Sequence, residues 1–206
     1  MSFTRTFLCA CAIGGLLSAP ALAEVPYDVQ PGGVYYLVDL QSGATLFGMD
    51  ADKRILPASM AKMMTAYVAF DLIKQKKLSL DDQFVMPPEL WRQWNNTGST
   101  MFIKSGQSVS VADLLHGVIT LSGNDASALL VHGISGSEAG FTTLMNEKAK
   151  EIGLRDSHFA NAKGWPDGGK TYSTARDLGT IAERTLQDFP DLYRQFYATR
   201  SFRFNG

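Results

Sequence analysis

The sequence has 206 residues, of which 45% are hydrophobic and 19% are charged, so it is a globular chain long enough to bury a core and not a disordered one. Its 19 Lys and Arg residues against 20 Asp and Glu residues give a net charge of -1, which offers no basic excess for a nucleic-acid partner. After the first 25 or so positions, no run of about 18 apolar residues predicts a membrane-spanning helix.

Residues 1–23 have the features of a secretory signal peptide. Arg5 supplies positive charge, residues 8–19 form an apolar stretch, and residues 21–23 (ALA) are a small-x-small cleavage site. An N-terminal anchor or buried helix is the alternative, but the apolar part is too short to span a bilayer. We therefore expect cleavage after Ala23 and secretion across the inner membrane.

Both cysteines, Cys9 and Cys11, lie inside this segment. A mature chain that begins at residue 24 has neither a disulfide framework nor a thiol nucleophile. Cys11 is an alternative lipoprotein site, although residues 8–10 match that signature imperfectly. The chemistry of the mature chain must therefore come from other side chains.

The mature chain begins with a predicted β-hairpin. β-Branched and aromatic residues fill 34–40, residues 41–43 (QSG) are a turn signal, and a second strand follows at 44–48. A helix is predicted from Pro57 to about Lys76, because apolar residues recur near 3.6 spacing and lysines gather at its C-terminal end.

After a predicted loop at 81–107, the chain is predicted to be mainly helical. Ser110 and either Ser173 or Thr174 are predicted N-caps, because their hydroxyls can accept from the first free amides of a helix. Alternation over 198–204 indicates a strand. The order of hairpin, helices and strand favours an α+β class over alternating βαβ units. The predicted helices span 110–121, 125–132, 137–152 and 174–187, with a turn at 122–124 and a glycine-rich loop at 161–172.

The first candidate for chemistry is the Ser-x-x-Lys motif of Ser59 and Lys62. Positions i and i+3 share one face of a helix, so the hydroxyl and the amine can meet. A serine in the first turn also lies at the positive end of the helix dipole, beside unpaired amides that suit an oxyanion hole. The lysine can act as a base if a dry pocket lowers its pKa. Read alone, however, the motif favours a simple N-cap at Ser59 over a nucleophile, since Ser-x-x-Lys occurs about once by chance in such a chain.

The second candidate is Ser122-Gly123-Asn124, in the turn between two predicted helices. The serine could relay a proton, and the asparagine amide could hold a substrate carbonyl. The same three residue types are also usual in an ordinary connecting turn. The two motifs together, in a secreted chain, form the pattern of the penicillin-recognising serine enzymes.

The residues around both motifs resemble the D-alanyl-D-alanine carboxypeptidases of the low-molecular-mass penicillin-binding protein group. The resemblance extends over about residues 25–206, in several blocks that come in the same order. The blocks are 57–67 (PASMAKMMTAY), 98–102 (GSTMF), 122–127 (SGNDAS), 159–161 (FAN) and 172–178 (YSTARDL).

This resemblance implies a β-lactamase/transpeptidase-like α+β fold, with an antiparallel sheet packed with helices. It implies that Ser59 is the acyl-ester nucleophile, Lys62 the general base and Ser122 the proton relay. Asn124 would bind the substrate amide, and the main-chain N–H of Ser59 would form half of the oxyanion hole. The implied reaction removes the terminal D-alanine from peptidoglycan pentapeptides through an acyl-serine intermediate, in cell-wall remodelling.

One departure from the family pattern concerns its third motif, a Lys-Thr-Gly on a late strand that binds the substrate carboxylate. The single Lys-Thr pair here, Lys170-Thr171, is followed by Tyr172 and lies in the predicted loop, so we interpret it as unrelated. We therefore expect residues 24–206 to be the N-terminal part of the catalytic domain, ending before that strand, with an incomplete sheet. Such a fragment is expected to be inactive or unstable alone.

Two other functions stay open. A class A-like β-lactamase carries Ser-Asp-Asn and a deacylating glutamate, whereas position 123 is Gly here. A non-catalytic muropeptide-binding protein of the same fold is the second alternative, which the intact Ser59 and Lys62 disfavour. The resemblance implies as partners the D-Ala-D-Ala stem peptide and β-lactam inhibitors. It also implies a periplasmic location, with peripheral membrane association through a segment beyond Gly206 left open.

The remaining candidate side chains have plain interpretations. His116, His132 and His158 are scattered and no cluster has metal-ligand spacing, so we predict neither a metal nor a cofactor. A Ser-His-Asp triad stays open, but nothing pairs a histidine with either serine motif. Trp91 and Trp94, with the two asparagines after them, fit either loop packing or the lining of a glycan or peptide cleft.

Overall fold

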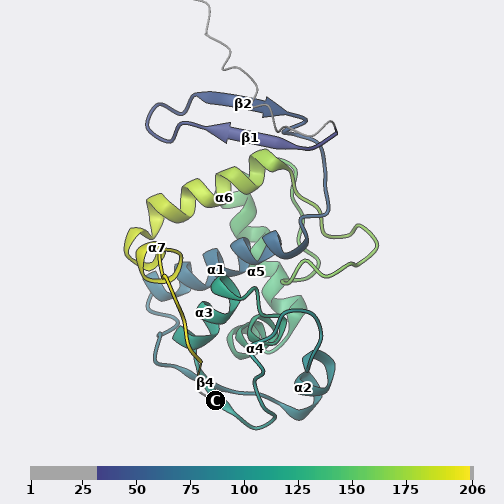
Figure 1. The fold of residues 1–206 in the computed structure, drawn as a ribbon, viewed down its shortest axis with the longest axis vertical. Helices are drawn as coiled ribbons and strands as arrows, with labels where there is room; N and C mark the ends of the chain where they lie inside the picture. The colour runs from purple at the N-terminus through teal and green to yellow at the C-terminus, as the bar shows by residue number, and fades with distance from the viewer. Residues whose placement is uncertain (1–31, 205–206) are drawn as a thin grey trace, which may run out of the picture.

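The computed structural model describes residues 32–204, so the predicted signal peptide lies outside the described residues. The β-hairpin lies on α6, α6 packs over α1, and α3 and α4 lie on the other side of α1 (Figure 1). The elements in chain order are β1 (Tyr35–Val38), β2 (Thr45–Met49), the 3-10 turn η1 (Ala58–Ala61), α1 (Lys62–Lys74), β3 (Gln83–Val85), α2 (Pro88–Trp94), β4 (Ser108–Ser110), α3 (Val111–Thr120), α4 (Asn124–Ser135), α5 (Glu138–Glu151), α6 (Ala175–Asp188) and α7 (Pro190–Phe196).

Helix α1 lies at the centre of the core. Residues 64–70 are all buried, as expected for a helix that is packed on every side, and α1 contacts α3, α5 and α6. The ring of Phe70 lies 5.9 Å from that of Phe189 and 5.7 Å from that of Phe196, which ties α7 to the same core. The N-terminal end of α1 is therefore a rigid support for functional side chains.

Side-chain caps mark the beginnings of α3, α5 and α6. Ser110 Oγ accepts from the Asp113 N–H at 3.1 Å, which confirms the predicted start of α3. Of the two candidates at the start of α6, Thr174 is the cap, and its Oγ1 accepts from the Asp177 N–H at 3.0 Å. Helix α4 runs past the predicted end at 132, because the left-handed Gly136 (φ 71°) is the residue that ends it.

The strands of the described residues form two antiparallel pairs. The predicted hairpin is confirmed by β1 and β2, in which Tyr35 pairs with Met49. The second pair, β3 with β4, lies at the edge of the region predicted to be mostly loop, and α2 lies within that region. The prediction of mostly loop is confirmed for the greater part of 81–107, but it did not include β3 and α2. Pro88 occupies the first turn of α2, where its missing N–H has no helical partner to lose.

The predicted strand at 198–204 is also wrong. These residues follow α7 as irregular chain and pair with no strand among the described residues. The alternation instead places aromatic rings against α3, since Phe202 stacks on His116 with ring centroids 4.8 Å apart. A period of two cannot distinguish a strand from an extended segment that packs alternate side chains. Helix α7, which begins with Pro190, was not predicted.

Candidate active site

The first two predicted site residues meet at the start of α1. Ser59 lies on η1, and Lys62 is the first residue of α1, one turn later. Their side chains lie on the same face, with Lys62 Nζ 3.2 Å from Ser59 Oγ. Ser59 is exposed, whereas Lys62 is only 4% exposed. A reachable hydroxyl thus lies beside a buried amine.

The turn between α3 and α4 brings the other two predicted residues to the same amine. Ser122 Oγ lies 3.4 Å from Lys62 Nζ, and Asn124 Oδ1 accepts from Lys62 Nζ at 2.8 Å. Ser122 has a left-handed backbone (φ 55°), which is uncommon for a residue other than glycine. Such strain persists where surrounding contacts fix it, often at functional sites. All four predicted residues therefore converge on one point, which is Lys62 Nζ.

The acceptors around Lys62 orient its lone pair when the amine is neutral. Asn124 Nδ2 donates to the Thr97 carbonyl at 2.9 Å, which turns Oδ1 toward Lys62. The Lys163 carbonyl oxygen lies 3.4 Å from Lys62 Nζ. A neutral amine has two N–H groups and one lone pair, and these two oxygens can only accept. With both N–H groups directed to them, the lone pair is left for a serine hydroxyl.

The surroundings of Lys62 also favour its neutral form. Burial, with a smaller contribution from the positive charge of Lys163, lowers the pKa of the Lys62 amine to about 8. With a pKa of about 8, roughly one molecule in ten has a neutral amine at pH 7. A lysine with its ordinary pKa would be almost fully charged there and could not accept a proton.

A buried carboxylate fixes the beginning of α4 in place. Asp125 is only 3% exposed, and its oxygens accept from the main-chain N–H groups of Met101 and Ile103 at 2.9 and 3.1 Å. The Asn124 N–H donates to the Ser99 carbonyl at 2.7 Å. The 98–102 block, which had no predicted role, therefore clamps the turn that carries Ser122 and Asn124.

Close backbone packing positions the nucleophile turn. Ala58, directly before Ser59, has a left-handed backbone (φ 48°), and Gly164 (φ 68°) lies against its carbonyl group. A Cβ atom at position 164 would overlap the Ala58 carbonyl oxygen. Position 164 therefore requires glycine for two reasons, which are its left-handed conformation and the close approach of the two backbone segments.

We expect Gly164→Ala to destabilise the fold by about 2–4 kcal/mol, the sum of a left-handed penalty and a backbone displacement. Gly153→Ala is the matched control, since Gly153 also has a left-handed backbone (φ 83°) but has nothing within 4 Å of its Cβ position. The control should lose only about 1 kcal/mol. Urea unfolding of both variants measures the difference, and equal losses would contradict the packing argument.

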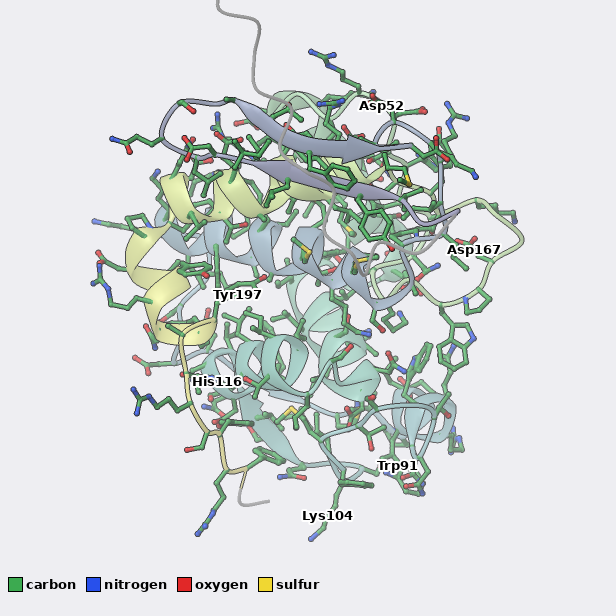
Figure 2. The ribbon with its side chains drawn as sticks, turned by 45° about the horizontal axis from the view of Figure 1, so that its top comes forward. Asp52, Trp91, Lys104, His116, Asp167 and Tyr197 are labelled. Atoms are coloured by element: carbon green, nitrogen blue, oxygen red, sulfur yellow. The ribbon has the colours of Figure 1, made fainter. Side chains whose placement is uncertain are left out.

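Lys62 lines one cavity, and a second cavity lies beside Lys163. The first, of about 290 Å³, is lined by Ser59, Lys62 and Ser122 and reaches Tyr197. The second, of about 300 Å³, is lined by Trp94, Lys163, Asp167 and their neighbours. Figure 2 shows Tyr197, which lines the first cavity, and Asp167, which lines the second, toward opposite sides of the molecule. The first cavity gives a ligand access to the candidate nucleophile.

The comparisons with known proteins agree with this geometry. The family model described as D-alanyl-D-alanine carboxypeptidase matches residues 23–205. The chain belongs to this family. The D-alanyl-D-alanine carboxypeptidase DacA of Haemophilus influenzae is 38% identical over 83% of this chain and 43% of its own length. DacC of Escherichia coli is 37% identical over the same shares.

The solved structures of relatives confirm the predicted fold class. Penicillin binding protein 5 from Haemophilus influenzae matches with a TM-score of 0.79 and 37% identity, covering 86% of this chain and 52% of that one. Penicillin binding protein 6B from Escherichia coli matches with a TM-score of 0.76 and 31% identity, covering 89% and 59%. The chain spans about half the length of the relatives it matches.

The Lys170-Thr171 pair is not among the residues that contact Lys62 Nζ. The Thr171 N–H and hydroxyl both donate to the Asp167 carboxylate, and Thr171 Oγ1 accepts from the Ala160 N–H at 3.1 Å. Thr171 is fully buried by these contacts. Its role is to close the 161–172 loop.

The histidines and tryptophans have structural surroundings. Among the described residues, none of the three histidines makes a hydrogen bond with Ser59 or Ser122. His116 lies between the rings of Phe196 and Phe202, and burial lowers its pKa. Trp94 is buried and lines the second cavity, as the cleft interpretation expects. Trp91 instead packs against the core, as the packing interpretation expects.

Sequence reasoning missed Lys163 and Glu138, which lie beside the site. They come from the 161–172 loop and the first residue of α5, and their side chains form an ion pair behind Lys62. No spacing pattern links positions so far apart in the chain. A lysine two residues after the recognised 159–161 block was the one signal present.

Proposed function

We propose that this chain carries the nucleophile part of a serine D,D-carboxypeptidase, which removes the terminal D-alanine from peptidoglycan stem peptides that end in D-Ala-D-Ala. The observation that carries the proposal is the buried Lys62 amine, with Ser59 Oγ at 3.2 Å and Ser122 Oγ at 3.4 Å. The carboxypeptidase names of the relatives support the substrate class.

In the proposed reaction, Ser59 Oγ attacks the carbonyl carbon of the penultimate D-alanine while its proton passes to Lys62 Nζ. The main-chain N–H of Ser59 stabilises the oxyanion that forms. The C–N bond then breaks, and the leaving amine takes a proton through the Ser122 hydroxyl. Water hydrolyses the acyl-serine ester, which releases the shortened peptide and restores Ser59. Asn124, whose Oδ1 accepts from Lys62 and whose Nδ2 donates one N–H to the Thr97 carbonyl, donates its second Nδ2 N–H to the carbonyl of the substrate amide.

Export belongs to the same proposal. The signal-like features of residues 1–23 would deliver the chain to the periplasm, where its proposed substrate lies. Within residues 32–204, no helix is long and apolar enough to cross a membrane. Peripheral attachment to the membrane stays a prediction from the sequence.

The test is covalent labelling of the full-length protein with a fluorescent penicillin, followed by mass spectrometry of the labelled peptide. The proposal expects the label on Ser59 and release of D-alanine from a D-Ala-D-Ala peptide. Rapid turnover of a chromogenic cephalosporin without D-alanine release would instead support a β-lactamase, which the names of the relatives do not favour. Tight muropeptide binding without labelling would support the non-catalytic alternative.

A further inference from the structure

Lys163 is a buried cation that the proposed reaction does not use. It is only 4% exposed, and its ammonium pairs with the Glu138 carboxylate. The ammonium also lies 4.6 Å from the centre of the Trp94 ring, on the face that attracts cations. A buried charge is costly unless such partners surround it, so this pair fixes the lysine in one position.

The same carboxylate fixes the backbone around Lys163. Glu138 Oε1 accepts from the Ala162 N–H at 3.1 Å, and Asn161 Oδ1 accepts from the Lys163 N–H at 3.1 Å. These contacts hold the Lys163 carbonyl oxygen toward Lys62 Nζ. Glu138 is the first residue of α5, so the loop is anchored to a packed helix.

The charged groups that face Lys62 from the elements around it have unequal effects. From α4, the Asp125 carboxylate is directed to the main-chain amides of Met101 and Ile103. From α5, Glu138 is engaged by Lys163. From the 161–172 loop, Lys163 contacts Lys62 Nζ through its main-chain carbonyl at 3.4 Å, while its ammonium pairs with Glu138 and acts on the amine as a like charge. Protonation of Lys62 therefore adds a second buried cation to this part of the core, whereas a neutral amine does not.

We propose that Lys163 is a positioning residue for Lys62. Its main-chain carbonyl takes one N–H of the amine, and its ammonium, held by Glu138, keeps the amine neutral and its lone pair free for a serine hydroxyl. The chemical meaning of this role rests on the proposed function, whereas the electrostatic coupling between the two lysines can be measured without it.

The coupling is tested by a ¹³C NMR titration of the lysine ε-carbons, with the Lys62 signal assigned by its loss in Lys62→Met. We expect Lys163→Met to raise the titration midpoint of Lys62 by roughly one pH unit, the scale of removing one nearby like charge. Lys163→Arg keeps the charge and should keep the midpoint near that of the wild type. The matched control is Lys148→Met, which removes another lysine paired with acids, Asp71 and Glu151, away from the site.

A second variant separates the cation from its carboxylate partner. Lys163→Met leaves Glu138 unpaired, and that negative charge alone could raise the midpoint. Lys163→Met/Glu138→Gln removes both charges while the glutamine oxygen can still accept from Ala162, and a raised midpoint is again expected. Lys163→Gln replaces Lys163→Met if the apolar side chain disturbs folding, as judged by thermal unfolding. A Lys62 midpoint that stays within about 0.2 unit of wild type in the double variant overturns the proposal.

The acylation rate as a function of pH links this coupling to the chemistry. The neutral fraction of Lys62 rises as pH rises through its pKa, so the acid limb of penicillin acylation should move to higher pH in Lys163→Met, with little change on its alkaline plateau. A uniform loss of rate at every pH overturns the electrostatic role in favour of a structural one. A raised NMR midpoint in a protein that never acylates would refute the proposed function while the coupling holds.

Discussion

Replacing Ser59 with alanine is expected to abolish covalent labelling by penicillin. The hydroxyl is the one group beside Lys62 that is both exposed and at the start of the central helix, 3.2 Å from the amine. Loss of a serine nucleophile lowers rates by about 10⁶, which is below detection in a labelling experiment. Intact-protein mass spectrometry after incubation with a fluorescent penicillin measures this directly.

The chain offers a matched control for that substitution. Ser127 lies on α4 and is fully buried, and its Oγ has no hydrogen-bond partner among the described residues. Ser127→Ala also removes a serine Oγ, here from the 122–127 block near the site. It should cost little stability, because no hydrogen-bond partner is left unpaired. It should label at the wild-type rate. Labelling of Ser59→Ala at that rate would show that another side chain is the nucleophile.

The outline of the fold follows from local signals in the sequence. Ser110 and the Ser173/Thr174 pair marked helix starts because capping depends on residues within one turn. The same locality explains the errors. Proline was taken as a sign of loop in 81–107, although Pro88 begins a helix. The aromatic alternation of 198–204 was taken as a strand, although those rings pack on α3 without a partner strand.

Residue spacing alone predicted only the Ser59–Lys62 part of the site, whereas Ser122 and Asn124 were predicted from the resemblance to a known family. Ser59 and Lys62 are one helical turn apart, so their contact follows from helix geometry. The approach of Asn124 to the same amine follows from the packing of α4 against α1, which no spacing reveals. The left-handed backbone of Ser122 and the glycine requirement at 164 depend on neighbours distant in sequence. Long-range contacts of this kind determine the pKa of Lys62.

Replacing Lys62 with arginine is expected to lower penicillin acylation by about 10²–10⁴, the range that general-base catalysis contributes. Arginine keeps the positive charge but cannot deprotonate, so it can donate to Asn124 and never accept the Ser59 proton. In the wild type, the rate should rise with pH to a plateau above a midpoint near 8, because burial, together with the charge of Lys163, lowers the pKa of Lys62 to about 8. Lys62→Arg should show no such midpoint. Stopped-flow acylation between pH 5 and 10, a range of about two to three units on either side, measures both.

Because arginine is larger than lysine, a rescue experiment must separate the lost base from disturbed packing. The sequence has two cysteines, and both precede residue 24. Lys62→Cys therefore places a single thiol within residues 24–206, and alkylation with bromoethylamine rebuilds an amine of nearly the length of lysine. Acylation should return in the alkylated variant and stay lost in the unalkylated one, with alkylated wild type as the control. If Lys62→Arg acylates within about threefold of wild type, Lys62 is not the base, since such a factor is far below the contribution of a positioned proton acceptor.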